Sequence, residues 1–396
     1  MQFVKNCCLS LLWVISGVRK RDSNTWIFTS WSGENYSDNS RVFYEWIRKN
    51  HSEIKCFWLL KNDSLIKALN DKKIHAVNSE SKEGKRLLSI AGKIFTVRDD
   101  EFSFFRINGA EWYQLWHGMP LKKIKSDYLD GIKTISKKSI VASRILEFVM
   151  PWGVNRYRKR FTCTNSSFFI PYLSSSFNLS ADRILTCGTP RCDALFYCNE
   201  EHILKRLSEK YENCRFILYM PTCRTSQWDG KYFEPFAEQY GFNFSELNEV
   251  LEKRNFVFLY KPHFYEERVL NLKKVSERFV TITNDDIGEL YNFCGQIDIL
   301  ITDYSSIYFD FIVTRKPVIL MPFDYEEYLR TSRNHYFDYF TQMAGIKALN
   351  WHEALKILDD ESYRPVTEDK IKQFAEFVDG KSCEKLYECI IKGDCQ

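Results

Sequence analysis

The sequence predicts an α/β protein with two Rossmann-like domains, each built around a mainly parallel sheet. Short β-branched or aromatic runs alternate with helical segments from residue 25 onward, which is typical of βαβ units. The chain has 396 residues, more than the roughly 100 to 200 residues of an ordinary domain. Two hydrophobic cores are therefore expected.

The first series of elements runs from residue 25 to residue 190. It opens with a strand at 25–31 and a helix at 39–50 that Ser37 or Asp38 caps. Its fifth strand leads straight into His117. The later strands are expected at 54–60, 74–77, 94–97, 112–116, 161–165 and 184–187, and the later helices at 64–70, 82–91 and, within a Lys-, Arg- and Ser-rich insertion, 139–150.

A second series follows the chain break at Gly188-Thr189-Pro190-Arg191. The chain is therefore expected to divide into a domain at 25–190 and a domain at 191–365, with an apolar and basic segment at 1–24 and a helical segment at 366–396. The second domain has expected strands at 215–220, 256–261, 297–302 and 317–321, and expected helices at 244–254, 289–294 and 306–314.

The amino-terminal segment has an apolar run at 7–18, which is shorter than the ~20 residues needed to span a bilayer. The basic residues Arg19-Lys20-Arg21 follow this run, whereas a signal peptide carries its charges before it. Two interpretations remain. Trp13 among leucines beside a basic cluster favours a helix that contacts a membrane surface, and the alternative is a first helix packed on the domain.

Charge and cysteine content narrow the class further. A formal net charge of +4 gives no reason to expect a nucleic-acid partner. The 13 cysteines are odd in number and irregularly spaced, which favours reduced thiols in the cytoplasm over a disulfide framework. No cysteine and histidine group has zinc spacing.

Polar clusters follow four of the predicted strands, and ligands of open parallel sheets bind at the carboxyl ends of strands. The first is Trp116-His117-Gly118, where glycine permits a tight turn and close approach of a ligand. His117 is the candidate general base. Gly118 and Lys122 are expected beside it.

The other three clusters lie in the second domain. Thr222 and Arg224 follow one strand, and an arginine fork suits a phosphate. Lys261 and His263 flank a proline at the end of the next strand. A cation beside an imidazole suits a diphosphate. The last cluster lies at the start of a helix, where unpaired backbone N–H groups favour anions. It comprises Asp303, Ser305, Ser306 and Asp310.

These clusters, in this order, resemble the CDP-glycerol glycerophosphotransferase family, which includes teichoic acid primases and polymerases. The sequence has no GxxxxGK[ST], HExxH or GxSxG motif. The resemblance covers nearly the whole chain after the first two dozen residues. The matching segments are SWSGENYSDNSR (30–41), WHGMPLKKI (116–124), CGTPRCDALF (187–196), YMPTCRT (219–225), YKPH (260–263) and ITDYSSIYFDF (301–311).

The resemblance implies a GT-B-like fold, with an acceptor-side first domain and a CDP-donor-binding second domain facing a central cleft. It implies transfer of glycerol phosphate, or another alditol phosphate such as ribitol phosphate, from a CDP-alditol to a lipid-linked or polysaccharide acceptor. His117 then resembles the base for the acceptor hydroxyl, and His263 the second essential histidine, near the donor diphosphate. The remaining donor contacts by this resemblance are Arg224, Asp303, Ser305 and Ser306.

The implied location is the cytoplasmic face of the cell membrane, in teichoic acid or capsule-type synthesis. No cofactor is required by these residues, although Asp303 or Asp310 could hold a divalent metal. One stretch departs from the family, because Asn334 and His335 stand where a glycine and an aromatic residue are common. Two alternatives are a GT-B glycosyltransferase that uses a nucleotide sugar and a nucleotide-binding scaffold with a degenerate site.

Overall fold

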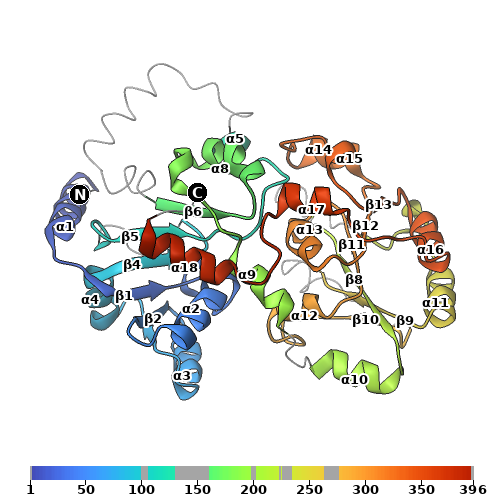
Figure 1. Ribbon diagram of the computed structural model, residues 1–396, viewed down its shortest axis with the longest axis horizontal. Helices are drawn as coiled ribbons and strands as arrows, with labels where there is room; N and C mark the ends of the chain where they lie inside the picture. Colours follow the sequence, from blue (N-terminus) through green and yellow to red (C-terminus); the bar gives the residue numbers. More distant parts are fainter. Residues whose placement is uncertain are drawn as a thin grey trace. The chain divides into compact units, whose positions relative to one another are not determined.

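The computed structural model describes residues 2–99, 106–129, 160–197, 202–222, 224, 234–262 and 276–393, the side chains of 2–7, 129 and 202 excepted. The helix expected at 139–150 lies outside these residues. The chain divides into two compact units (Figure 1). Unit 1 comprises Met1–His117, Lys125–Arg191 and Lys381–Gln396, and unit 2 comprises Gly118–Ile124 and Cys192–Gly380.

Unit 1 is built on a sheet of seven parallel strands in the order β3-β2-β1-β4-β5-β6-β7. The direction of the chain's progress across the sheet reverses between β1 and β4, which is the switch point where doubly wound sheets bind ligands. The strands are β1 Asp22–Phe28, β2 Lys55–Leu60, β3 Ala76–Asn78, β4 Ala91–Thr96, β5 Glu111–Gln114, β6 Arg160–Thr164 and β7 Ile184–Thr186.

The helices of unit 1 begin at residues suited to capping. The Asn62 side chain accepts hydrogen bonds from two backbone N–H groups at the start of α3, and Ser81 accepts one at the start of α4. The helices with described bounds are α1 Gln2–Val18, α2 Asp38–Asn50, α3 Asp63–Asp71, α4 Lys82–Ile90, α5 Lys125–Leu129, α8 Ile170–Phe177, α9 Pro190–Asp193, which runs on into unit 2, and α18 Ser382–Lys392.

Unit 2 repeats the same winding with six parallel strands in the order β10-β9-β8-β11-β12-β13. Its switch point lies between β8 and β11, where Ile301 pairs with Tyr219. The strands are β8 Arg215–Met220, β9 Phe256–Tyr260, β10 Phe279–Thr281, β11 Ile299–Thr302, β12 Val318–Leu320 and β13 Ile346–Lys347.

Aromatic residues dominate one face of the unit 2 sheet. The fully buried Trp351 packs edge-on against Tyr219, with ring centroids 5.3 Å apart. Helices α11 and α16 lie side by side over this cluster (Figure 1). The helices are α10 His202–Lys210, α11 Phe244–Lys253, α12 Leu290–Gly295, α13 Ile307–Phe311, α14 Tyr325–Thr331, α15 Tyr339–Gln342, α16 Trp351–Asp359 and α17 Glu368–Phe374.

The structure differs from the sequence-based expectations in several places. No helix was expected at the positions of α5, α8, α9, α10, α14, α15 and α16. Strands β10 and β13 are absent from the prediction, because runs of two or three residues carry no readable alternation. The segment predicted as one piece at 366–396 is divided, with residues 381–396 in unit 1, where α18 lies beside α2 (Figure 1). Cys389 is in a disulfide, contrary to the expectation of reduced thiols, whereas eight other described cysteines have free thiols, as expected.

Candidate active site

The Trp116-His117-Gly118 turn lies where the sequence predicts, just past the carboxyl end of β5. The Leu115 N–H donates to the Thr96 carbonyl at 2.7 Å, which extends the pairing of β5 with β4 by one residue. The chain then leaves the sheet through left-handed backbone, with φ 58° at Trp116 and φ 146° at Gly118. Left-handed backbone is uncommon for a tryptophan, and it marks a constrained turn around His117.

The imidazole of His117 is oriented by its neighbours in unit 1. Nδ1 lies 3.3 Å from the Val97 carbonyl oxygen. Because a carbonyl only accepts, Nδ1 carries the proton of the neutral ring and Nε2 keeps its lone pair. The Trp31 ring, which follows β1, lies 5.2 Å away between centroids. His117 therefore sits at the switch point between β1 and β4.

Burial lowers the pKa of His117 to about 4, although the Asp38 carboxylate opposes this shift. The ring is therefore neutral at pH 7. A neutral imidazole with a free lone pair is a proton acceptor.

Three residues that the sequence-based prediction did not assign to the site support this turn. Asn39 Nδ2 donates to the Trp116 carbonyl at 2.8 Å, and Asn39 Oδ1 accepts from the Arg191 N–H at 2.9 Å. The Arg191 guanidinium pairs with the Asp38 carboxylate at 3.3 Å, and the two side chains are 3% and 9% exposed. Asp38 was interpreted as a possible helix cap and Arg191 as part of a chain break, and both lie in segments that match the family, at 30–41 and 187–196. The sequence did not indicate that the two side chains meet.

The donor-side cluster assembles at the switch point of unit 2. Asp303 follows β11, and its carboxylate accepts from the Thr222 N–H at 2.8 Å and from Arg224 Nη1. Arg224 makes a fork with Asp324, with both N···O distances 2.8 Å. Three predicted residues, Thr222, Arg224 and Asp303, thus lie together. Asp324 is a partner that the sequence-based prediction did not include.

This arrangement uses most of the guanidinium hydrogens of Arg224 within unit 2. Nη1 donates to the Thr222 carbonyl at 2.6 Å as well as to Asp303. The guanidinium also lies over the Tyr304 ring, 4.9 Å from its centroid. Arg224 is therefore held as the centre of a buried network, and a direct donor contact by its fork stays a prediction.

Two hydroxyl groups beside this network are buried and have no hydrogen-bond partner among the described residues. They belong to Tyr219, at the end of β8, and to Thr222. A buried polar group without a partner is costly, so such groups commonly face a ligand or water. Thr222 is thus the predicted residue best placed to contact a donor.

The remaining donor-side residues are more dispersed. Ser305 and Ser306 precede α13 and are partly exposed, and the Ile307 N–H lies 3.5 Å from Ser305 Oγ. Lys261 is buried, and its backbone N–H donates to the Tyr219 carbonyl at 3.0 Å. The Asp310 carboxylate accepts from the Tyr291 hydroxyl at 3.3 Å inside unit 2. His263 lies outside the described residues.

Gly118 and Lys122, predicted on the acceptor side, belong to unit 2 through the segment 118–124. This segment pairs with the stretch that departs from the family pattern. The Tyr336 N–H donates to the Leu121 carbonyl at 2.8 Å. The backbones of Lys122 and His335 form an isolated antiparallel β-bridge. Both ring nitrogens of His335 are buried without a partner in the described part of the chain, and burial lowers its pKa to about 4.

The described residues offer neither a metal-binding cluster nor a membrane-spanning helix. Among them, no group of three or more His, Cys, Asp or Glu side chains is placed to hold a metal ion. That no cofactor is required stays a prediction. Within the described ranges, no helix is both long and apolar enough to cross a bilayer.

Two parallel sheets, each with a switch point after its first strands, define an α/β fold of the GT-B-like class. The wall teichoic acid polymerase TagF has this fold, with a TM-score of 0.72 at 21% identity over 99% of this chain and 96% of that chain. Residues 12–392 match the family described as CDP-Glycerol:Poly(glycerophosphate) glycerophosphotransferase. The chain belongs to this family, as its motifs predict.

Similar proteins include teichoic acid enzymes named for glycerol phosphate and for ribitol phosphate. A poly(glycerol phosphate) polymerase of Bacillus subtilis is 26% identical over 93% of this chain and 49% of its own length. A glycerol-phosphate transferase of Staphylococcus aureus is 24% identical over 94% of both chains. The ribitol-phosphate polymerase TarL of the same species is 27% identical over 74% of this chain and 48% of its own. The chain thus spans about half the length of these two polymerases.

Proposed function

We propose that this protein transfers glycerol phosphate from CDP-glycerol to a hydroxyl of a lipid-linked or polysaccharide acceptor in teichoic acid or capsule-type synthesis. The observation that carries the proposal is the neutral His117 imidazole, whose lone pair is available at the switch point of unit 1. Family membership and the buried polar network after β8 and β11 support it.

The proposed reaction is a direct displacement at phosphorus. The acceptor hydroxyl attacks the phosphorus that bears glycerol, its proton passes to Nε2 of His117, and the bond to the bridging oxygen breaks. CMP leaves with that oxygen. A hydroxyl is a poor nucleophile at neutral pH, and a positioned base contributes typically ~10²- to 10⁴-fold. Lys261, His263, Ser305 and Ser306 are proposed to meet the charge on the leaving CMP, with Thr222 as a further donor contact.

Ribitol phosphate is the alternative transferred group, because relatives of both donor types match this chain. We further propose that the reaction takes place at the inner face of the cell membrane. Residues 1–24 are the proposed contact with the membrane surface, since Arg19 and Lys20 adjoin an apolar helix.

A donor screen tests the proposed function. The purified chain is incubated with a synthetic lipid-linked glycerol phosphate acceptor and with CDP-glycerol, CDP-ribitol or a panel of UDP-sugars. We expect CMP release with CDP-glycerol and a product whose mass increases by one glycerol phosphate. Product formation from a UDP-sugar, without turnover of either CDP-alditol, would overturn the proposal in favour of a glycosyltransferase.

A further inference from the structure

Helix α1 has two different faces. Trp13 and Ser16 are buried against unit 1, whereas Leu11, Val14, Ile15 and Val18 point outward. Their spacing of three and four residues places the four apolar side chains on one stripe of the helix. Leu11 is 61% exposed and Val18 is 82% exposed. The stripe is therefore an apolar surface presented to the surroundings.

The folded unit holds this helix in place. Ser16 Oγ donates to the Arg106 carbonyl at 2.5 Å, and Asn108 Nδ2 donates to the Trp13 carbonyl at 3.0 Å. Arg21 donates to five backbone carbonyls around the end of the helix, at distances of 2.6 to 3.4 Å. They belong to Ser16, Leu88, Ala91, Arg106 and Asn108. One face of α1 is thus packed on the domain, as the second interpretation expects, and the other face is open. Contact of the open face with a membrane surface stays a prediction.

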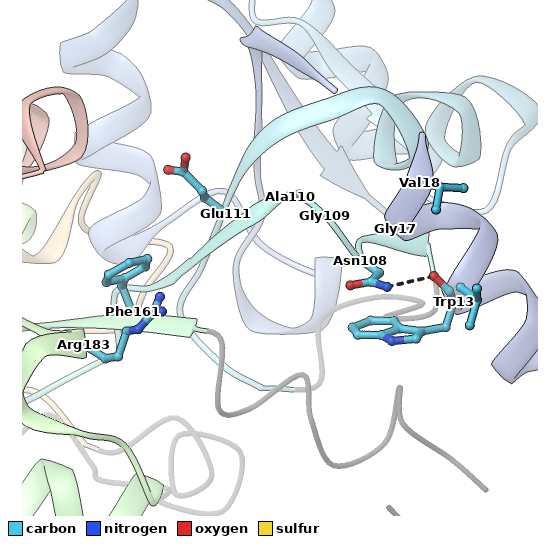
Figure 2. A pocket seen from close by; sticks show the side chains of 10 residues that line it. Trp13, Gly17, Val18, Asn108, Gly109, Ala110, Glu111, Phe161 and Arg183 are labelled. Carbon is cyan, nitrogen blue, oxygen red and sulfur yellow. Dashed lines mark hydrogen bonds between the residues drawn. The ribbon is translucent and has the colours of Figure 1, made fainter. Parts of the chain in front are cut away.

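A pocket of about 660 Å³ lies beside the open face (Figure 2). Val14, Gly17 and Val18 of α1 form one side, and Ala110, just before β5, adjoins them. Arg183 and Phe161 lie at the other end, away from the helix (Figure 2). The pocket is thus apolar at the helix and carries a cation at its far end.

The charges around the pocket favour an anionic ligand. The Arg183 guanidinium lies over the Phe161 ring, 4.5 Å from its centroid. Its Nε lies 3.7 Å from a carboxylate oxygen of Asp182, whose side chain is 75% exposed. Among the described residues that line the pocket, the acidic one is Glu111, which pairs with Lys93 at 2.7 Å and accepts from the Tyr113 hydroxyl. The exposed cations Arg19 and Lys20 follow the apolar stripe directly.

We propose that this pocket binds an anionic amphiphile, with its apolar chain along Val14 and Val18 and its acidic head group at Arg183. The site is separate from the transfer site. Glu111 begins β5 and His117 follows its end, and six residues of extended chain span about 20 Å. The pocket therefore lies at the amino-terminal end of β5, whereas His117 lies past the carboxyl-terminal end. Its proposed role is to bind a lipid and not the reacting groups. This inference extends the proposed membrane location and does not depend on the transferred group.

Binding of decyl phosphate to the full chain tests the site, with decyl maltoside and inorganic phosphate as the two partial probes. We expect saturable binding of decyl phosphate that is at least tenfold tighter than that of either partial probe. R183E and V18W should each weaken it about tenfold. K49E makes the same charge change on an exposed residue of α2 and should leave binding unchanged. Thermal unfolding of each variant checks that it is folded.

Equal binding of decyl phosphate by wild type, R183E and V18W would overturn the assignment, and so would inorganic phosphate binding as tightly as decyl phosphate. A vesicle-binding assay distinguishes binding to a lipid surface from binding of a single soluble amphiphile. The double variant L11D/I15D, which leaves the pocket lining intact, should lose binding to phosphatidylglycerol vesicles and keep decyl phosphate binding, whereas I391D on α18 should lose neither. These measurements require no turnover, so their failure leaves the donor screen unaffected.

Discussion

The protonation state of His117 follows from its immediate surroundings. Burial disfavours the charged ring, and the Val97 carbonyl selects the tautomer whose Nε2 accepts a proton. The Asp38 carboxylate partly offsets the burial, and Arg191 in turn neutralises Asp38. A negatively charged donor bound near His117 would act in the same direction as Asp38 and raise the pKa of the ring. His117 would then be a stronger base with the donor bound than without it.

Replacement of His117 by glutamine is expected to lower the transfer rate about 10²- to 10⁴-fold, because the hydroxyl loses its proton acceptor. CDP-glycerol binding, measured by calorimetry, should be retained. H75Q replaces an exposed histidine of the same unit and should have full activity.

The pH profile of the wild type gives a second readout of the same assignment. Because the pKa of His117 is about 4, kcat/KM should stay flat as the pH falls from 7 to about 5. An acid limb centred near the ordinary histidine pKa of ~6.5 would contradict the assignment of His117 as a buried neutral base.

At the scale of elements, helix α4 shows how closely a helix can approach a strand. A Cβ atom built on Gly84 would lie 2.2 Å from the Asn78 carbonyl oxygen, at the end of β3. Backbone atoms at such a distance cannot move aside without shifting the strand. Gly84 is therefore required by the packing of α4 against β3, although glycine lowers the intrinsic stability of a helix.

Replacement of Gly84 by alanine is expected to destabilise the protein, even though alanine gains about 1 kcal/mol of helix propensity over glycine. Overpacking of this kind costs typically about 1 to 3 kcal/mol, and the clash involves backbone, so the cost should win. Urea unfolding measures the difference. Lys67→Ala on the exposed face of α3 is the control and should change stability by less than about 0.5 kcal/mol. A Gly84→Ala variant more stable than wild type would disprove the packing argument.

Across the whole molecule, the described residues of each unit include one partly buried histidine whose pKa burial lowers to about 4, His117 in unit 1 and His335 in unit 2. In the unfolded chain both titrate near ~6.5. As the pH falls below this value, the unfolded chain takes up protons that the folded chain does not bind until about pH 4. Their contribution to stability is therefore complete above about pH 6.5 and is lost as the pH falls toward 4.

Replacing His335 with phenylalanine is expected to flatten this pH dependence. Tyrosine rings surround the position, with Tyr304 and Tyr325 centroids 5.6 and 5.5 Å away, so an aromatic ring suits it. The melting temperature of H335F should fall less than that of wild type between pH 6.5 and 4.5. The carboxylates are common to both proteins, so the difference reports His335 alone. An equal fall in melting temperature for H335F and wild type over this pH range would refute the lowered pKa of His335.

The local pattern of the sequence predicted the described strands other than β10 and β13 to within about three residues, because alternation is a property of short segments. Helices such as α10 and α16 were not predicted. The local pattern also placed the polar clusters after the correct strands, as Thr222 and Asp303 show. The family was predicted from the order of these clusters and is confirmed. The role of His263 stays a prediction.

Tertiary structure alone decided which distant residues meet. Asp38, His117 and Arg191 come from separate segments, and only strand order and register bring them together. The same holds for the segment 118–124, which leaves the strand of unit 1 and pairs with residues of unit 2, and for α18, which returns to unit 1. The physical reason is that local periodicity encodes which face of an element is apolar, whereas the partner of that face is selected by packing across the whole chain.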